Sequence, residues 1–240
     1  MEVVDVLAKS RVLFDDQALT FAQFYSEWVD RRYADEFLRS IVRMGDLEQA
    51  ALAQQASVAR QLVQDLNQTA GFDRRDLACQ LLLVYCLFWW HAFARGYLFE
   101  VRIFRDLTAS GIEFAGHDIT DRTARQSPYD LVVSGMRGDI KYSTYFLSAE
   151  ALGRLQSDFF ITRAYDSTKR EWVTIAVLRS ETWRWINGET QAGTVQELSA
   201  LLPTPVRIQI GAHQLIVILY EEWKRRIRDL QAREGSDEHG

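Results

Sequence analysis

The chain has 240 residues, of which 48% are hydrophobic and only 3 are prolines. Such a chain can bury a substantial core, either as one domain or as a domain with an extension, so we expect a globular protein. Its formal net charge of -5 argues against a protein that coats nucleic acid or an anionic membrane through bulk charge. Any contact with nucleic acid must therefore be local.

The first part of the chain has a helical pattern. Apolar residues recur at helical spacing from about residue 19 to residue 67, beginning with Phe21 and Phe24. We therefore predict an α-helical N-terminal extension over residues 1–70. We expect this extension to serve homodimerisation or the binding of a protein partner.

A long second helix is predicted next, with Asp73 placed to cap it and an end near Ala109. It contains an uncharged run of eighteen residues, 77–94, which is long enough that a membrane span must be considered. Gln80 interrupts this run, and the helical pattern continues beyond it with charged residues. We therefore favour a buried core helix and no membrane partner, with a span over 77–94 as the alternative.

Cys79 and Cys86 are the two cysteines of the chain, and both fall within that helix. Seven residues of α-helix separate their backbones by about 10 Å along the axis, which is too far for a disulfide. We interpret both as buried thiols of a reducing compartment. The N-terminus also lacks the basic, apolar and small-residue order of a signal peptide, so we expect a cytoplasmic protein.

Beyond residue 110 the chain consists of short segments rich in β-branched and aromatic residues, which are typical of strands. The predicted strands are residues 112–119, 129–133, 138–143, 159–165, 172–178, 206–210 and 215–220. A short helix over 148–155, capped by Ser148, separates the third strand from the fourth, and a charged helix over 221–233 follows the last. The predicted fold class is α/β (α+β), with a central mixed sheet flanked by helices in a second domain over residues 71–240.

The segment "SPYDLVVSGMRGDIKYS" reads as a hairpin with a tight turn at Ser134 and Gly135. Residues whose numbers sum to 269 then face each other, so Asp130 lies opposite Asp139, and strand alternation returns Lys141 to the same face. Opposed like charges weaken a sheet, and carboxylates removed from water are costly. A divalent cation such as Mg²⁺ gives a reason for them, because it prefers carboxylate oxygens.

At these residues the chain resembles the PD-(D/E)XK nuclease superfamily, which has the restriction-endonuclease-like fold. The family pattern would be Asp130 on one strand, then "DIK" with Asp139 and Lys141 on the next, and Glu100 on the preceding helix. The resemblance covers residues 89–165 and implies a Mg²⁺- or Mn²⁺-dependent endonuclease acting on DNA. It implies that Asp130, Asp139 and Glu100 bind the metal and that Lys141 organises the attacking water.

The order of these residues carries more weight than the acid-x-lysine triplet alone. Glu222, Trp223 and Lys224 match the same triplet on a predicted charged helix. The chain has only 4 lysines, yet one occupies this strand position, where a compact ammonium suits a metal-water site. In the alternative reading, Asp139 and Lys141 form an exposed pair on an edge strand and Glu100 is solvated surface.

The histidines are interpreted differently, since none has a partner at metal-binding spacing in the sequence. We take His91, His117 and His213 as structural or exposed residues. Nucleic-acid contacts are assigned instead to arginine and lysine, which suit phosphate groups. The predicted contact residues are Arg122, Arg125 and Arg137 in loops near the site, and Lys224, Arg225 and Arg226 on the last helix. A charged face of that helix exposed to solvent is the alternative for the second group.

Two functions from different classes follow from these patterns. The first is a metal-dependent nuclease. The second is a non-catalytic subunit with a nuclease-like fold that acts in a larger nucleic-acid-processing complex. The acidic net charge and the large helical extension favour the second reading, whereas the carboxylate pair favours the first.

Overall fold

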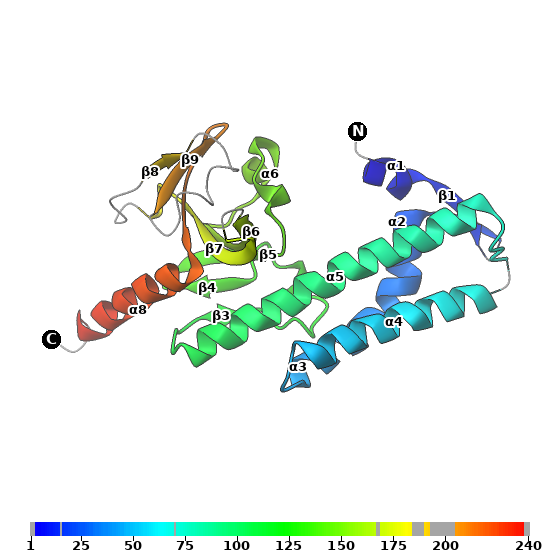
Figure 1. Cartoon of the computed structure of the whole chain (residues 1–240), viewed down its shortest axis with the longest axis horizontal. Helices are drawn as coiled ribbons and strands as arrows, with labels where there is room; N and C mark the ends of the chain where they lie inside the picture. Colours follow the sequence, from blue (N-terminus) through cyan, green and yellow to red (C-terminus); the bar gives the residue numbers. More distant parts are fainter. Residues whose placement is uncertain are drawn as a thin grey trace. The chain divides into compact units, whose positions relative to one another are not determined.

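The computed structural model describes residues 3–14, 16–69, 71–166, 169–183, 190–192 and 205–237 (Figure 1). Its contacts divide the chain into two compact units, Met1–Val101 and Arg102–Gly240. The predicted division lay between residues 70 and 71, whereas this boundary falls inside one helix, α5 (Leu77–Ala109). The first part of α5 belongs to the N-terminal unit because its aromatic side chains pack there, as Trp90 does against Phe37.

The N-terminal unit is largely helical, as predicted. Before α5 its helices are α1 (Val3–Lys9), α2 (Phe21–Phe24), the π-helix η1 (Tyr25–Ala34), α3 (Asp35–Arg43) and α4 (Gln49–Gln68). The prediction did not include the short antiparallel hairpin of β1 (Arg11–Phe14) and β2 (Gln17–Thr20). Thr20 ends this hairpin and caps α2, because its side chain accepts the backbone N–H of Gln23.

The start of α5 corrects the predicted cap. Asp76 Oδ2 accepts the backbone N–H of Cys79 at 3.0 Å, whereas Asp73 accepts the N–H of Arg75 in the preceding turn. A carboxylate bonded to the amide three residues later satisfies a donor that the helix leaves unpaired, so Asp76 is the cap. Cys79 is a buried free thiol, as predicted.

One side of the first part of α5 is buried and the other is exposed. The buried residues include Leu82, Cys86 and Trp90, and burial raises the pKa of Cys86 to about 12. The large exposed apolar residues are Leu77, Leu81, Val84 and Phe88. By length and composition α5 could cross a membrane, and 33% of its most apolar window is buried within the protein. The helix is therefore a core element on one side only.

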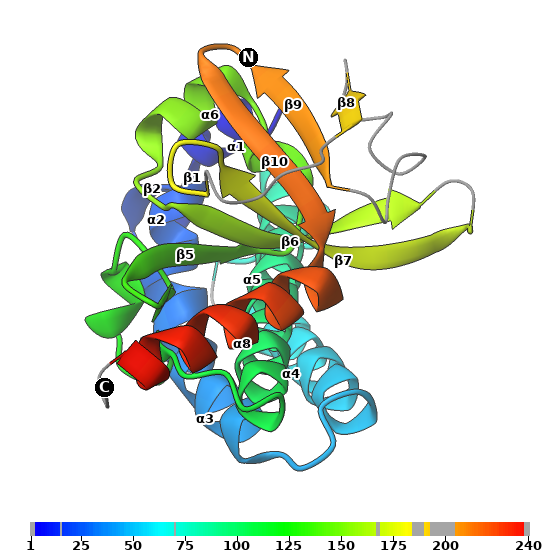
Figure 2. The same cartoon turned by 90° about the vertical axis from the view of Figure 1, so that its left-hand side faces the viewer.

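A single mixed sheet organises the C-terminal unit, in the strand order β3-β4-β5-β6-β7-β10-β9-β8. The strands are β3 (Ala115–Gly116), β4 (Leu131–Val133), β5 (Met136–Lys141), β6 (Phe159–Asp166), β7 (Glu171–Arg179), β8 (Thr190–Ala192), β9 (Val206–Ile210) and β10 (His213–Leu219). The pairs β5–β6 and β8–β9 are parallel, and the other neighbours are antiparallel. Figure 2 shows β5, β6, β7 and β10 side by side in this sheet. The predicted mixed α/β class is confirmed.

Two differences from the predicted strands have local causes. The strand predicted over 112–119 is only Ala115–Gly116, because Ile112 donates its N–H to the Leu107 carbonyl and so completes the end of α5. β8 was not predicted. The helix predicted over 148–155 is α6 (Ala149–Arg154), and its predicted cap is confirmed, since the Ser148 hydroxyl accepts the N–H of Ala151.

Helices cover both faces of the sheet. Phe159 and Phe160 are successive residues of β6, so their side chains point to opposite faces. Phe160 lies in a buried cluster with Leu152 of α6. The Phe159 ring lies 5.2 Å from that of Trp223 on α8 (Tyr220–Asp237). The α6 crossover thus lies on one face and the closing helix on the other.

Candidate metal centre

The β4–β5 hairpin has the predicted register. Leu131 pairs with Gly138 and Val133 pairs with Met136. Ser134 and Gly135 link the strands with positive φ angles of 45° and 75°, as a two-residue hairpin turn of the mirror-image type requires. Because the register is fixed by this turn, the chain is set to bring Asp130 beside Asp139.

Asp130 lies directly before β4 and bonds to β5 through both its backbone and its side chain. Its N–H donates to the Gly138 carbonyl at 2.9 Å, and its Oδ2 accepts the N–H of Ile140 at 2.6 Å. The carboxylate therefore replaces a strand carbonyl as the partner of β5. This bond holds the Asp130 carboxylate over the strand that carries Asp139.

Asp139 is the most shielded of the three predicted catalytic residues on the hairpin. Its side chain is 3% exposed, and Lys141 Nζ lies 2.7 Å from its Oδ1, while the Lys141 side chain is 40% exposed. Burial, and then hydrogen bonding and charge repulsion from Asp130, raise the pKa of Asp139 to about 7, and the Lys141 ammonium opposes this rise. Two carboxylates that share one proton or one cation are the expected consequence of this packing.

Gly138 is required for the close packing beneath the site. A Cβ atom on Gly138 would lie 2.2 Å from the ring of Phe159, the residue that pairs with it on β6. The ring thus covers the backbone of β5 immediately before Asp139 and keeps water from that side of the strand.

His117 joins the site, which corrects its interpretation as a residue without a metal-site partner. β3 pairs with β4 so that Gly116 faces Leu131, and the next pair in that register is His117 and Asp130. The backbone N–H of His117 donates to the Asp130 carbonyl at 2.9 Å, and the imidazole Nδ1 of His117 lies 3.7 Å from Asp130 Oδ1. Asp130 is therefore common to the carboxylate pair and to the histidine.

Glu100 is buried, not solvated, with 6% of its surface exposed. It lies in the turn of α5 directly before Arg102, and α5 continues through that point as one helix. One donor atom each from Glu100, His117 and Asp130 lies within 4.8 Å of the others. Donor atoms bonded to one divalent ion at about 2.0–2.6 Å can be separated by up to twice that length, and the upper end of this range exceeds 4.8 Å, so the three can share a cation.

The sequence held no signal that could have placed His117 at the site. The number of His117 and that of Asp130 add to 247, as do those of the β3–β4 pairs, but nothing in a fourteen-residue connection fixes such a register in advance. The β4–β5 pairing could be predicted from the tight turn at Ser134 and Gly135, whereas the β3–β4 pairing depends on the tertiary structure.

The predicted loop arginines differ in their surroundings. Arg122 is exposed. Arg125 Nη1 donates to the Ile119 carbonyl at 3.0 Å, so part of its guanidinium supports the loop. Arg137 lies on β5 and not in the predicted loop; it is half exposed and lies 3.6 Å from Asp158. Of the three, Arg122 and Arg137 present the larger exposed cationic groups.

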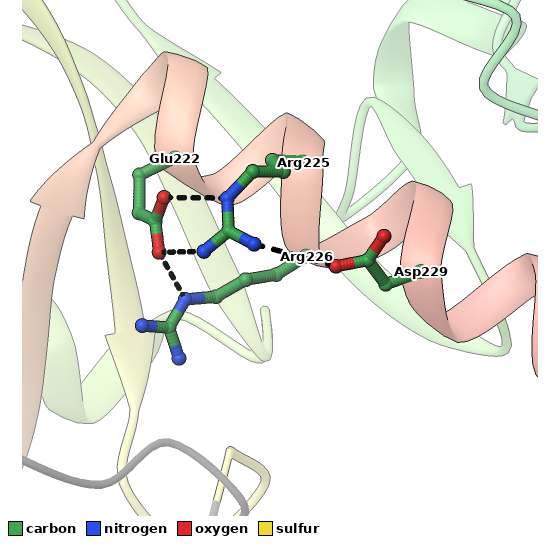
Figure 3. Close-up of polar contacts among 4 residues, drawn as sticks. All are labelled: Glu222, Arg225, Arg226 and Asp229. Atoms are coloured by element: carbon green, nitrogen blue, oxygen red, sulfur yellow. Dashed lines mark hydrogen bonds and ion pairs between the residues drawn. The ribbon is translucent and has the colours of Figure 1, made fainter.

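The basic run of α8 is mostly paired with its own helix. Arg225 and Arg226 both donate to Glu222, and Arg225 also reaches Asp229 (Figure 3). Lys224 is only 6% exposed, and its Nζ lies 2.7 Å from Asp106 Oδ2. These contacts match the alternative of a charged helix face and remove Lys224 from the exposed surface.

Comparison of the chain with family models, curated proteins and solved structures found no match.

Proposed function

We propose that the chain is a metal-dependent endonuclease that hydrolyses phosphodiester bonds in DNA. The observation that carries the proposal is the meeting of Asp130, Asp139 and Lys141 at the edge of β4 and β5. Both carboxylates are largely removed from water, where their mutual repulsion is costly unless a cation or a proton offsets it.

Each residue has a role that its position allows. Asp130 and Asp139 would hold the divalent cation, and Glu100 and His117 would complete its ligands. When bound, the cation supplies charge stabilisation and lowers the pKa of a coordinated water. Lys141 is fixed by Asp139 on one side and open to solvent on the other, so its ammonium can orient the attacking water or stabilise a phosphoryl oxygen.

His117 favours Mn²⁺ over Mg²⁺ within this proposal. An imidazole nitrogen suits first-row transition metals, whereas Mg²⁺ prefers an all-oxygen shell with several waters. The presence of His117 within ion-pair distance of Asp130 supports Mn²⁺ as the activating ion.

The order of elements also supports the proposal. A helix, three strands, a helix and a strand follow one another from α5 to β6, and β6 runs parallel to β5 after the α6 crossover. This order is the one expected of a restriction-endonuclease-like core, which is the finer fold that we propose for the C-terminal unit.

A cleavage assay with matched variants tests the nuclease. The purified chain would be incubated with plasmid and with labelled single-stranded and branched oligonucleotides, in Mg²⁺ and in Mn²⁺. We expect cleavage by the parent and none by Asp139→Ala or Lys141→Ala. Glu222→Ala is the matched control and should cleave as the parent does. Glu222 is the first residue of the second acid-x-lysine triplet, which lies on α8. Equal cleavage by Asp139→Ala and the parent would refute the assignment.

The alternative is a non-catalytic subunit of a nucleic-acid-processing complex. One observation favours it: the Lys141 ammonium lies 2.7 Å from Asp139 Oδ1 and offsets the charge of that carboxylate. Calorimetric titration with Mn²⁺ separates the two functions. Binding that is lost in Asp139→Ala supports the nuclease, and heat identical to that of buffer supports the subunit.

A further inference from the structure

Three side chains, on β6, on β7 and directly after the end of β5, form a stacked group in the C-terminal unit. The guanidinium carbon of Arg163, on β6, lies 5.2 Å from the ring centroid of Tyr142 and 5.2 Å from that of Trp172, on β7. Arg163 Nη1 also donates to the Tyr142 hydroxyl at 2.9 Å. The guanidinium is thus fixed between two aromatic rings by cation–π contacts and a hydrogen bond.

A fourth residue extends this group into an exposed surface. Tyr165 faces Trp172 directly in the β6–β7 register, and their ring centroids are 5.6 Å apart at an interplanar angle of 66°. Trp172 is 59% exposed and Tyr165 is 48% exposed. We call Tyr142, Arg163, Tyr165 and Trp172 the aromatic platform.

Positive charge lies beside the platform. Lys169 and Arg170 are exposed in the turn that leads into β7, two to three residues before Trp172. Asp166, the acid at the end of β6, is buried and accepts the N–H of Lys169. The exposed acid Glu171 lies between Arg170 and Trp172, so the positive charge beside the platform comes from Arg163 together with the partly offset pair Lys169 and Arg170.

The platform begins where the candidate metal centre ends. Tyr142 directly follows Lys141, and Arg163 directly follows Thr162, the residue that pairs with Lys141. Strand alternation places the platform on the opposite face of the sheet from Lys141. The β6–β7 hairpin extends away from β5 (Figure 2), so a strand of nucleic acid bound at Lys141 would have to pass around the end of β5 to reach the platform.

We propose that the aromatic platform binds unpaired nucleobases of single-stranded nucleic acid, with a base stacked on Trp172 and Tyr165 and phosphates held by Arg163 and Lys169. Aromatic rings and arginine planes accept any base, but they need a base that is free of a duplex stack. This inference rests on the proposed nuclease for its ligand class and names the substrate class as nucleic acid with an unpaired segment.

The test is a binding measurement that is independent of cleavage. Fluorescence anisotropy would follow labelled single-stranded DNA, single-stranded RNA and duplex DNA of equal length in EDTA. We expect both single strands to bind more tightly than the duplex. Loss of one stacking contact in Trp172→Ala should weaken single-strand binding roughly 5- to 100-fold. Trp172→Phe should keep most of the affinity.

Controls separate this inference from folding and from the nuclease. Leu52→Ala removes a large apolar residue of similar exposure, 60%, from α4 of the N-terminal unit and should bind as the parent does. Thermal unfolding would show that Trp172→Ala is folded. Platform-dependent binding without cleavage would refute the nuclease but not the platform. Equal single-strand affinity of folded Trp172→Ala and parent, or tighter binding of duplex, would overturn the platform.

Discussion

Lys141 Nζ lies 2.7 Å from Asp139 Oδ1, yet the Lys141 side chain is 40% exposed and that of Asp139 is 3% exposed. The ion pair therefore joins a buried carboxylate to an ammonium that solvent or substrate can reach. This difference in exposure underlies the first two predictions below.

Lys141→Arg should lose activity although it keeps the positive charge. A planar guanidinium cannot take the place of a compact ammonium beside a metal-bound water, so we expect cleavage to fall by about 10²-fold or more. Manganese binding, measured by calorimetry, should stay within a few-fold of the parent. Cleavage at the parental rate would show that only the charge at position 141 matters.

Asp139→Asn should stabilise the metal-free protein at high pH. The folded-state pKa of Asp139 is about 7 and its ordinary value is 3.8, so the stability that the protonated carboxyl contributes is fully present below pH 3.8. It is lost as the pH rises through about 7. Asparagine does not titrate. The free energy of unfolding of the variant, relative to that of the parent, should therefore rise by about 2–4 kcal/mol as the pH increases from 4 to 8.

Urea unfolding in EDTA at several pH values measures this gain. The difference between Asp139→Asn and the parent should grow with pH and level off above pH 8. Saturating Mn²⁺ should reverse it, because only the parent gains binding energy. A difference that is independent of pH would contradict the buried, metal-free carboxylate.

His117→Ala should weaken Mn²⁺ binding more than Mg²⁺ binding. A nitrogen ligand contributes chiefly to transition-metal affinity, so we expect a loss of about 10-fold or more for Mn²⁺ and a smaller one for Mg²⁺. Titration calorimetry of both ions measures it. His91→Ala is the control, since His91 is bonded to Gln55 in the N-terminal unit. Equal losses for the two ions would remove His117 from the ligand set.

Lys224 and Arg225 are neighbours in a basic run, but replacing each of them should change the stability of the protein by different amounts. Lys224 is buried against Asp106, whereas Arg225 is exposed and bonded within α8. We expect Lys224→Ala to cost about 1–3 kcal/mol of unfolding free energy and Arg225→Ala to leave the unfolding free energy nearly unchanged. Urea unfolding of both variants gives the comparison, and equal costs would contradict the burial of Lys224.

The exposed side of α5 sets the behaviour of the N-terminal unit in solution. We expect the purified chain to stay soluble without detergent and to self-associate through Val84 and Phe88, which are 60% and 53% exposed. Val84→Glu with Phe88→Glu should lower the mass measured by light scattering. A parent that needs detergent to remain in solution would favour the membrane-span alternative.

The sequence by itself determined the elements whose signals are local. Helical spacing predicted the helical N-terminal section and a helix that ends at Ala109, and Ser148 marked the start of α6. The Ser134–Gly135 turn fixed the register of β4 and β5, because a two-residue turn leaves no freedom in the pairing. That register was sufficient to place Asp130 beside Asp139.

Tertiary structure alone decided the contacts across long connections. His117 meets Asp130 through the β3–β4 pairing, which the fourteen residues between those strands do not fix, and Glu100 is buried although its position on a long helix suggested solvated surface. Lys224 resembles a surface cation in the sequence, but α8 packs it against Asp106 of α5. The aromatic platform likewise depends on the neighbouring positions of β5, β6 and β7. Local patterns set which face a residue occupies, whereas the partner on that face depends on how distant segments pack together.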